Sequence, residues 1–428
     1  AWAVQPEVKT VPWVPSNLLI PHDTISGDQH TLKGTANVQG ANFQFTWDFG
    51  DGSPVVVGTV TNQYVIEAVH AYTGTAGDVF TARLTVEDTS TGETDSAVYF
   101  VMVQDPSLGV EVNQAIDQGL WYLHKTMTRF VSGSVDAGYW YSGYAGSGYV
   151  SNWASNIQAF EVNGHLASGD ASNPYTETVA RGLAYLFNSL SYYNISSQAN
   201  ALGTFNPDVN TNGIGVRVAQ SYEFYQAGMV LDAIVASNTP AAVAPLGPSN
   251  VVGRTYADIV QDMVDYYSFC QYDGSSGGGW RYSCNQAPDG SVAQWAAIGL
   301  IAAERGFGST IPQIVKDWNR VWVDFAHDAA TGQSGYTQAG YYPWGPYATT
   351  PSGTVQMAMD GIGRGTQLWD SSELFLRSTF CNTGGAYYAI RNNYYGLFSF
   401  TKSMLLHDSN ADGVSEPITL LGGDLDWY

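Results

Sequence analysis

The spacing of apolar residues changes near Asp105-Pro106-Ser107, and this change constrains the fold more than any other feature of the sequence. Before it, short runs alternate apolar and polar residues, as half-buried strands do. After it, apolar residues recur at three- and four-residue spacings, as on the buried face of a helix. We therefore expect an extended segment over 1–20, an all-β domain over 21–105, and an all-α domain with a C-terminal tail over 107–428.

Strand-like runs between turn signals fill the first domain. They span 30–37, 42–48, 55–60, 80–86 and 96–103. Short strands at such spacing predict a β-sandwich. The segment that precedes them is rich in Pro and contains Trp2 and Trp13, so we expect it to be extended and to belong to neither domain.

One motif in this domain resembles the PKD family. Trp47-Asp48-Phe49-Gly50-Asp51-Gly52 is followed by His70-Ala71-Tyr72 and by Leu84-Thr85-Val86, similar to the family's WDFGDG, HxY and LTV pattern. The resemblance implies an immunoglobulin-like β-sandwich that serves as an extracellular spacer or adhesion module. The residues themselves suit a structural role, because Trp47 and Phe49 can fill a core while the aspartates and glycines shape a tight turn.

The helix-like segments after residue 107 fall into about five pairs. The amphipathic first partners span 109–130, 173–193, 255–270, 311–327 and 369–381. The second partners, richer in Ala, Gly and Ser, span 152–167, 216–237, 291–305, 353–364 and 393–407. Repeated helical hairpins must stack to bury a common core, so we expect an (α/α) toroid of about five helical hairpins.

Residues 278–306 resemble the prenyltransferase and squalene-cyclase repeat. A GGWRY loop precedes Asp289-Gly290-Ser291-Val292-Ala293-Gln294-Trp295 at the start of a small-residue helix. The resemblance implies a barrel of inner and outer helices. The sequence lacks the DxDD acid motif, the Asp, Cys and His zinc pattern and the GCGEQ thioester found in proteins with this fold. These activities are therefore not expected, and fold transfers more safely than function.

The charge balance excludes several classes of partner. Lys and Arg number 16 and Asp and Glu 38, which gives a net charge of −22. This field repels nucleic acids and anionic lipid headgroups. No run approaches the ~20 apolar residues of a membrane span, so no membrane insertion is expected. Few charged residues, many Gly, Ser, Thr, Asn and Tyr, and an opening at Ala1 favour a mature protein that is secreted to the extracellular space or cell surface.

Aromatic residues gather in the loops that join first to second helices. They are Tyr139, Trp140, Tyr141, Tyr144, Trp280, Tyr282, Tyr341, Tyr342, Trp344, Tyr347, Tyr387 and Tyr388. Because these loops should emerge at one end of the barrel, we expect one aromatic face. Its rings would either stack on sugars or pack the loops and mediate protein contacts.

Acidic residues on or beside the second helices are the candidate catalytic groups, since glycoside cleavage generally needs two carboxyl groups at the scissile bond. They are Glu161 with His165 one turn later, Asp232, Asp289, Glu304 and Asp360. None lies in a recognisable motif, so solvated or capping roles are the alternative. Asp289 in particular suits the N-cap of the helix at 291.

Asp408-Ser409-Asn410-Ala411-Asp412-Gly413 resembles the first half of an EF-hand or dockerin calcium loop. Oxygen ligands stand at positions 1, 3 and 5 and Gly at 6, and Glu416 is a further candidate ligand. Thr419 stands where the bidentate Glu is expected, so a plain turn is the alternative.

The three cysteines show no metal-binding spacing. Cys270 and Cys284 flank a loop and predict a disulfide in an oxidising compartment, with Cys381 as the rival partner.

These features favour a secreted structural or adhesive protein of the cell surface or extracellular matrix, a filament subunit that assembles through its aromatic face and N-terminal segment. The first alternative is a polysaccharide lyase or glycoside hydrolase with an (α/α) barrel cleft, and the second is a non-catalytic carbohydrate-binding protein. The expected partners are copies of the chain or a polysaccharide. The one expected cofactor is Ca²⁺, and enzymatic activity is not favoured, because the sequence contains no catalytic motif of the toroid enzymes.

Overall fold

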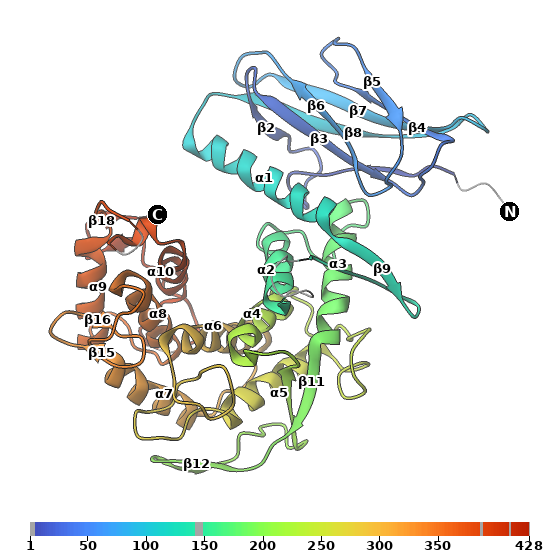
Figure 1. Ribbon diagram of the computed structural model, residues 1–428. Helices are drawn as coiled ribbons and strands as arrows, with labels where there is room; N and C mark the ends of the chain where they lie inside the picture. The colour runs from blue at the N-terminus through green and yellow to red at the C-terminus, as the bar shows by residue number, and fades with distance from the viewer. Residues whose placement is uncertain (1–4, 142–148, 386–387, 411, 428) are drawn as a thin grey trace. The chain divides into compact units, whose positions relative to one another are not determined.

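The computed structural model describes residues 5–141, 149–385, 388–410 and 412–427. The chain forms two compact units. Unit 1 comprises Ala1–Gly148 and Asn156–Tyr185, and unit 2 comprises Tyr149–Ser155 and Leu186–Tyr428. Figure 1 labels their helices and strands. The boundary expected near residue 106 thus lies within unit 1, because the first helices belong to the same compact unit as the sheets.

Two β-sheets of unit 1 are visible in Figure 1, and their buried residues form one hydrophobic core. One sheet has the strand order β2–β8–β7–β4–β5 and the other the order β1–β3–β6, with all pairs antiparallel except β2 and β8. The strands are β1 Val8–Thr10, β2 His22–Ile25, β3 Gln29–Ala36, β4 Phe43–Asp48, β5 Val56–Thr59, β6 Ile66–Ala71, β7 Val79–Asp88 and β8 Glu93–Gln104. Strands β2 and β6 were not anticipated from the sequence.

The residues of the Trp-Asp-Phe-Gly-Asp-Gly motif have structural roles. Trp47 and Phe49 are buried in the shared core. Gly50 has a φ of +76°, and a Cβ there would lie 2.2 Å from a backbone oxygen of β7, so no larger residue fits. Asp51 pairs with His70 at 2.7 Å next to the turn. The motif therefore fixes the β4 turn against the rest of unit 1.

Part of the N-terminal segment belongs to the smaller sheet. Residues 8–10 form β1, which pairs with β3, and both Val8 and Val11 are buried. The expectation that residues 1–20 lie outside any domain is therefore wrong for this stretch. Pro6 and Pro12 flank β1 without disrupting it because β1 is an edge strand, where missing N–H donors are tolerated.

The first helices end earlier than the periodicity predicts. Helix α1 spans Leu108–Thr126, because the next residues form the hairpin of β9 Thr128–Ser132 and β10 Val135–Tyr139. Helix α2 spans Val150–Glu161, with its first turns in unit 2 and the remainder in unit 1. Helix α3 spans Pro174–Leu186 and is followed by a strand rather than by further helix.

The remaining helices lie in unit 2. They are α4 Glu223–Ala236, α5 Tyr256–Phe269, α6 Gly290–Phe307, α7 Gln313–Ala326, α8 Pro346–Met359, α9 Gln367–Thr379 and α10 Tyr394–Leu406. Helix α4 packs on α6, α6 on α8 and α8 on α10, while α5, α7 and α9 pack against this row. The row consists of the predicted second helices. None of the helices in the described residues is long and apolar enough to cross a membrane.

Short elements connect these helices. The two-stranded pairs are β11 Leu190–Asn194 with β14 Ile214–Val218, β12 Gln198–Asn200 with β13 Gly203–Phe205, β15 His327–Asp328 with β16 Gln333–Ser334, and β17 Leu420–Leu421 with β18 Leu425–Asp426. Short 3₁₀ helices span Phe187–Ser189 and Ile390–Asn392. Because β14 precedes α4, the helix expected from residue 216 begins only at 223.

Small residues let α4 and α6 approach each other closely. A Cβ on Gly228 would lie 2.0 Å from the backbone oxygen of Trp295, and a Cβ on Gly299 would lie 2.8 Å from the Cα of Gly228. Both contacts are shorter than packed atoms allow, so glycine is required at this crossing. The Ala- and Gly-rich composition of the second helices thus has a packing reason.

Candidate functional site

A cleft of about 1210 Å³ lies in unit 2. It is lined by the first turns of α2, α4, α6, α8 and α10, together with residues from connecting loops. Its described lining residues are Tyr149, Ser151, Asn152, Ser155, Tyr222, Tyr225, Gln226, Met229, Tyr282, Ser291, Trp295, Tyr336, Trp344, Ala348, Thr349, Ser352, Asn393, Tyr394, Tyr395 and Phe398. The second helix of every predicted pair therefore contributes its N-terminal turns to one wall of the cleft.

Helical periodicity explains which residues reach the cleft. On α4 and its N-cap the lining residues are Tyr222, Tyr225, Gln226 and Met229, and on α6 they include Ser291 and Trp295. Residues three and four apart share one face of a helix. Each helix thus turns one face of its N-terminal turns to the cleft and uses the rest of its surface for packing.

Aromatic rings form two contacting groups within the cleft. In one group, Trp295 lies 6.0 Å from Tyr225 and 5.2 Å from Phe398, measured between ring centroids. In the other, Tyr222 lies 6.2 Å from Tyr149 and 4.8 Å from Tyr282. These separations are typical of tilted and edge-to-face ring pairs, which hold the side chains in defined orientations.

The described lining contains no Asp, Glu, Lys, Arg or His. A buried carboxylate nevertheless lies close to the tyrosines. Burial, and in smaller part the charge of Asp289, raises the pKa of Tyr225 and of Tyr336. These hydroxyls are therefore neutral at physiological pH and can both donate and accept hydrogen bonds.

Asp289 itself is occupied with holding α6. Its Oδ1 accepts hydrogen bonds from the backbone N–H groups of Ser291 and Val292, each at 3.0 Å. Its Oδ2 lies 3.4 Å from Nε of Arg281, and the side chain is fully buried. The predicted N-cap role is the one the geometry shows.

Amide side chains fix the neighbouring walls to one another. Gln226 on α4 accepts a hydrogen bond from the backbone N–H of Ser151 at 3.3 Å and donates to the carbonyl of Ser221 at 2.7 Å. Gln294 on α6 accepts a hydrogen bond from the hydroxyl of Ser399 on α10 at 2.8 Å. These bonds hold the first turns of the wall helices in place.

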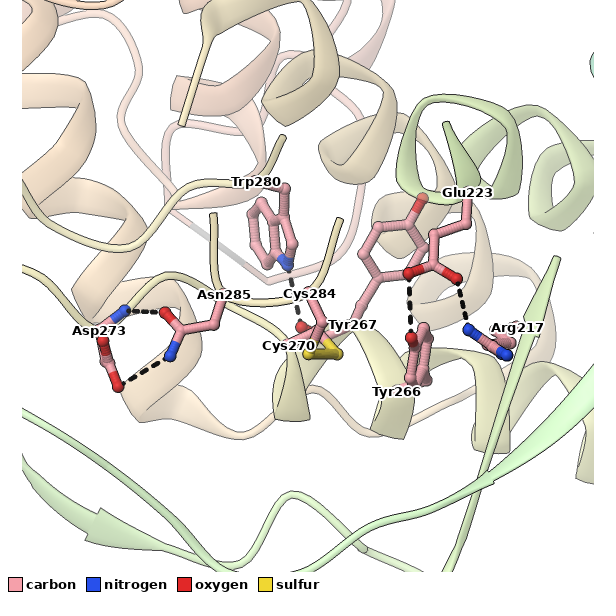
Figure 2. The surroundings of a disulfide bond; sticks show 9 residues. All are labelled: Arg217, Glu223, Tyr266, Tyr267, Cys270, Asp273, Trp280, Cys284 and Asn285. Carbon is pink, nitrogen blue, oxygen red and sulfur yellow. Dashed lines mark hydrogen bonds and ion pairs between the residues drawn. A yellow bond between two sulfur atoms is a disulfide. The ribbon is translucent and has the colours of Figure 1, made fainter. Parts of the chain in front are cut away.

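A disulfide joins Cys270 to Cys284 beside the loop that leads into α6 (Figure 2). Within this loop Trp280 is buried and donates from Nε1 to the carbonyl of Tyr267 at 2.9 Å. Tyr282, two residues later, lines the cleft. The same loop therefore provides one packing residue and one lining residue. Cys381 is a free, exposed thiol.

Glu223 is a carboxyl group that the sequence did not single out, and it follows the lining residue Tyr222. Figure 2 shows it between Arg217, at 3.2 Å, and the hydroxyl of Tyr266, at 3.1 Å. Burial raises the pKa of Glu223, although both partners oppose the shift. The group is part of a polar network and does not line the cleft.

The residues of the predicted aromatic face lie in different places in the structure. Tyr282 and Trp344 line the cleft. Trp140 is buried in unit 1, where Nε1 donates to the carbonyl of Leu123 at 2.7 Å. Tyr139, Tyr141, Trp280, Tyr341, Tyr342, Tyr347 and Tyr388 are not among the described lining residues. Tyr144 and Tyr387 lie outside the residues that the structure describes.

Most of the aromatic lining was missed because, apart from Tyr336 in the loop before α8, it lies on or directly beside the N-terminal turns of the second helices. The missed residues are Tyr149, Tyr222, Tyr225, Trp295, Tyr336, Tyr394, Tyr395 and Phe398. The sequence did contain a recurring signal. Tyr222, Trp295 and Tyr394 are aromatic residues at or near the first turn of a second helix.

The candidate acids are not brought together at the cleft. Glu161 and His165 are buried in unit 1, where the ring of His165 lies 2.9 Å from Nδ2 of Asn173. Burial lowers the pKa of His165 to about 4, so its ring is neutral at pH 7. Both side chains therefore lie in the packed interior of unit 1 and are not among the described lining residues of the cleft.

The acids of unit 2 are held by individual partners. Asp232 pairs with Lys402 at 3.1 Å, and Glu304 is bound by Lys316 at 2.7 Å. Asp360 is the C-cap residue of α8, at the end of that helix away from the cleft, and burial raises the pKa of its carboxyl group. None of these side chains is among the described lining residues of the cleft.

The predicted calcium loop is held by bonds within the protein. Oδ2 of Asp408 accepts from the backbone N–H of Gly413 at 2.9 Å and pairs with Arg305 at 3.1 Å. Ala411 lies outside the described residues, and among those described no group of three or more His, Cys, Asp or Glu side chains is arranged to hold a metal ion. Calcium binding stays a prediction.

No family model and no curated protein matches the chain. Similar solved structures include a family 76 glycoside hydrolase from a bovine Bacteroides thetaiotaomicron strain, at 8% identity and a TM-score of 0.41, covering 93% of this chain and 86% of that one. Another is the PKD domain of an M14-like peptidase from a Thermoplasmatales archaeon, at 14% identity and a TM-score of 0.16, covering 24% of this chain and 94% of that one. Both TM-scores are too low to bear on function.

Proposed function

We propose that the protein binds a neutral glycan chain in the cleft of unit 2. One observation carries the proposal: ten of the twenty described lining residues are aromatic and none is charged, in a protein with a net charge of −22. Aromatic rings can cover the apolar faces of pyranose rings, while a few placed polar groups orient the ligand. This corresponds to the non-catalytic carbohydrate-binding alternative.

The polar part of the lining supports a sugar over a purely apolar ligand. Seven of the aromatic residues are tyrosines, and serine, threonine and asparagine side chains stand between them. Such a surface alternates apolar faces with hydroxyl and amide groups, as a glycan does. An acidic glycan would find no Lys or Arg among the described lining residues. The proposal is therefore restricted to neutral chains.

Glycoside cleavage in the same cleft is the alternative from another class. It requires two carboxyl groups beside the bond that breaks. The described lining has neither Asp nor Glu, and the nearby Asp289 is buried as the cap of α6. These facts favour binding without cleavage.

We also propose that unit 1 presents a PKD-like immunoglobulin fold, that the helical hairpins form an (α/α) toroid, and that the protein is extracellular. The shared core of the two sheets, the row of second helices and the disulfide support these parts in turn. A filament or adhesive role has less support, because β1 takes up part of the segment expected to dock on a neighbouring copy.

The experiment is a binding panel by isothermal titration calorimetry with soluble α-mannan, β-glucan, xylan and, as an acidic comparison, alginate. We expect binding to at least one neutral chain and none to alginate. Trp344→Ala removes a lining ring that is 56% exposed, and Tyr341→Ala, 48% exposed but outside the described lining, is the matched control.

The area of the ring sets the expected size of the effect. A Trp side chain buries up to about 250 Å², and covering roughly a quarter of this area on binding gives about 1.5 kcal/mol, or roughly tenfold in affinity. Equal affinities for the Trp344 and Tyr341 variants would contradict the proposal. Newly formed reducing ends in the same mixtures would show that the cleft cleaves its ligand.

A further inference from the structure

A buried ion pair in unit 1 connects a strand of the smaller sheet to helix α1. Lys33 on β3 is 1% exposed, and its Nζ contacts Oδ2 of the buried Asp117. The two residues are 84 positions apart in the chain. We propose that they are a modification site, at which the amine of Lys33 and the carboxyl of Asp117 condense into an intramolecular amide cross-link.

The environment makes an ion pair a costly arrangement for these groups. Removing an ammonium and a carboxylate from water costs more than their attraction returns unless further hydrogen bonds satisfy both. Burial lowers the pKa of Lys33, although Asp117 opposes the shift, so the neutral, nucleophilic amine is more accessible than in an exposed lysine. An amide would replace both charges with one neutral group.

His22 is placed to move the proton that this reaction requires. Its Nε2 lies 2.9 Å from the carbonyl oxygen of Val11, which can only accept, so Nε2 carries a proton. Its Nδ1 lies 3.1 Å from Oδ1 of Asp117. Although burial raises it, the charges of Lys33 and His22 hold the pKa of Asp117 well below its usual value, so the carboxyl group receives its proton from the contacting Lys33 during the reaction.

The condensation balances without an added reagent. Nζ of Lys33 attacks Cγ of Asp117, so the Nζ–Cγ bond forms and one Cγ–O bond breaks. The departing oxygen takes one proton from the carboxyl group and one from the amine, and it leaves as water. His22 is placed to exchange a proton with Oδ1 of Asp117, the oxygen that departs, as a general acid and base does. Nothing is oxidised or reduced.

Stacked rings enclose the reacting groups. The ring of His22 lies parallel to that of Tyr99, with centroids 4.4 Å apart. The hydroxyl of Tyr99 lies 3.2 Å from Nε2 of His30, and burial lowers the pKa of His30 to about 3, so that ring is neutral. Groups held in contact and shielded from water react far faster than free groups.

The test is the mass of the full chain after denaturation and reduction of the disulfide, with a tryptic map. We expect a chain lighter than its sequence by one water molecule. Trypsin cannot cut after an acylated lysine, so residues 10–83 should stay together and be joined to residues 84–125. Lys33→Arg keeps the positive charge but should appear at its full sequence mass. A wild-type chain at full sequence mass, with residues 10–33 released as a free peptide, would overturn the cross-link.

His22→Phe tests the proton-transfer role while keeping an aromatic ring against Tyr99. We expect the cross-linked fraction, read from the joined peptide, to fall at least tenfold at early times after cell-free synthesis, when the chain has only just folded and no amide has formed beforehand. A variant that cross-links as completely and as fast as the wild type would remove His22 from the reaction.

Discussion

Replacing Asp289 separates the two uses that a carboxylate beside the cleft can have. Asp289→Ala removes the acceptor of two backbone N–H groups at the start of α6 and leaves Arg281 without its ion-pair partner. Loss of an N-cap costs about 1 kcal/mol, and the unsatisfied buried donors about one more. Asp289→Asn keeps an oxygen at the cap and removes only the charge.

We therefore expect Asp289→Ala to lower the free energy of unfolding by about 2 kcal/mol, which corresponds to a fall in Tm of roughly 4–8 °C for a unit of this size. Asp289→Asn should lose less than half as much and keep the glycan affinity of the wild type. Calorimetric melting and titration of both variants measure these quantities. If Asp289→Ala melts at the wild-type temperature, or if Asp289→Asn folds normally but loses all function at the cleft, the structural assignment is wrong.

Three further perturbations test the packing described above. Gly228→Ala places a Cβ against the backbone of α6 and should cost about 1–3 kcal/mol in chemical denaturation, whereas Gly109→Ala, with no atom within 4 Å, should be neutral or slightly stabilising; equal effects would refute the close crossing. Cys270→Ser opens a loop of sequence separation 14 and should cost about 3 kcal/mol, while Cys381→Ser should melt like the wild type; a harmless Cys270→Ser would speak against the disulfide. Burial holds the pKa of His165 at about 4, below its ordinary value of 6.5, so as the pH falls the unfolded chain binds a proton at His165 before the folded chain does. The contribution of His165 to the free energy of unfolding is therefore complete above pH 6.5, and it falls toward pH 4 by up to about 1.4 kcal/mol per pH unit. The difference in free energy of unfolding between the wild type and His165→Gln, measured in urea at pH 7 and pH 5, should change by a matching amount.

Local sequence signals predicted the local structure well. Trp47 and Phe49 are core residues, Gly50 needs its positive φ, and Asp289 caps α6. Each of these roles depends on neighbours within a few positions in the chain. The starts of α5 and α10 were likewise close to the predicted residues, because apolar periodicity marks the buried face directly.

Features that depend on distant partners were harder to predict. The helix expected over 109–130 stops at Thr126 because the next residues pair with β10, and β1 forms because β3 offers an edge. Trp280 and Tyr282 share one loop, yet the first is buried and the second lines the cleft. Composition does not distinguish two such rings, because the difference arises from how the loop folds over the helices.

The construction of the cleft wall has a consequence for how its selectivity can change. Five helices, α2, α4, α6, α8 and α10, each contribute residues from their N-terminal turns to the wall, and loops between them contribute the rest. A substitution at Tyr394, which lies at the start of α10, therefore changes the ligand surface on one helix whose backbone is separate from those of the other walls. Selection or engineering can revise one wall at a time while the remaining helices preserve the scaffold, so chains with this plan can diverge in ligand faster than in fold.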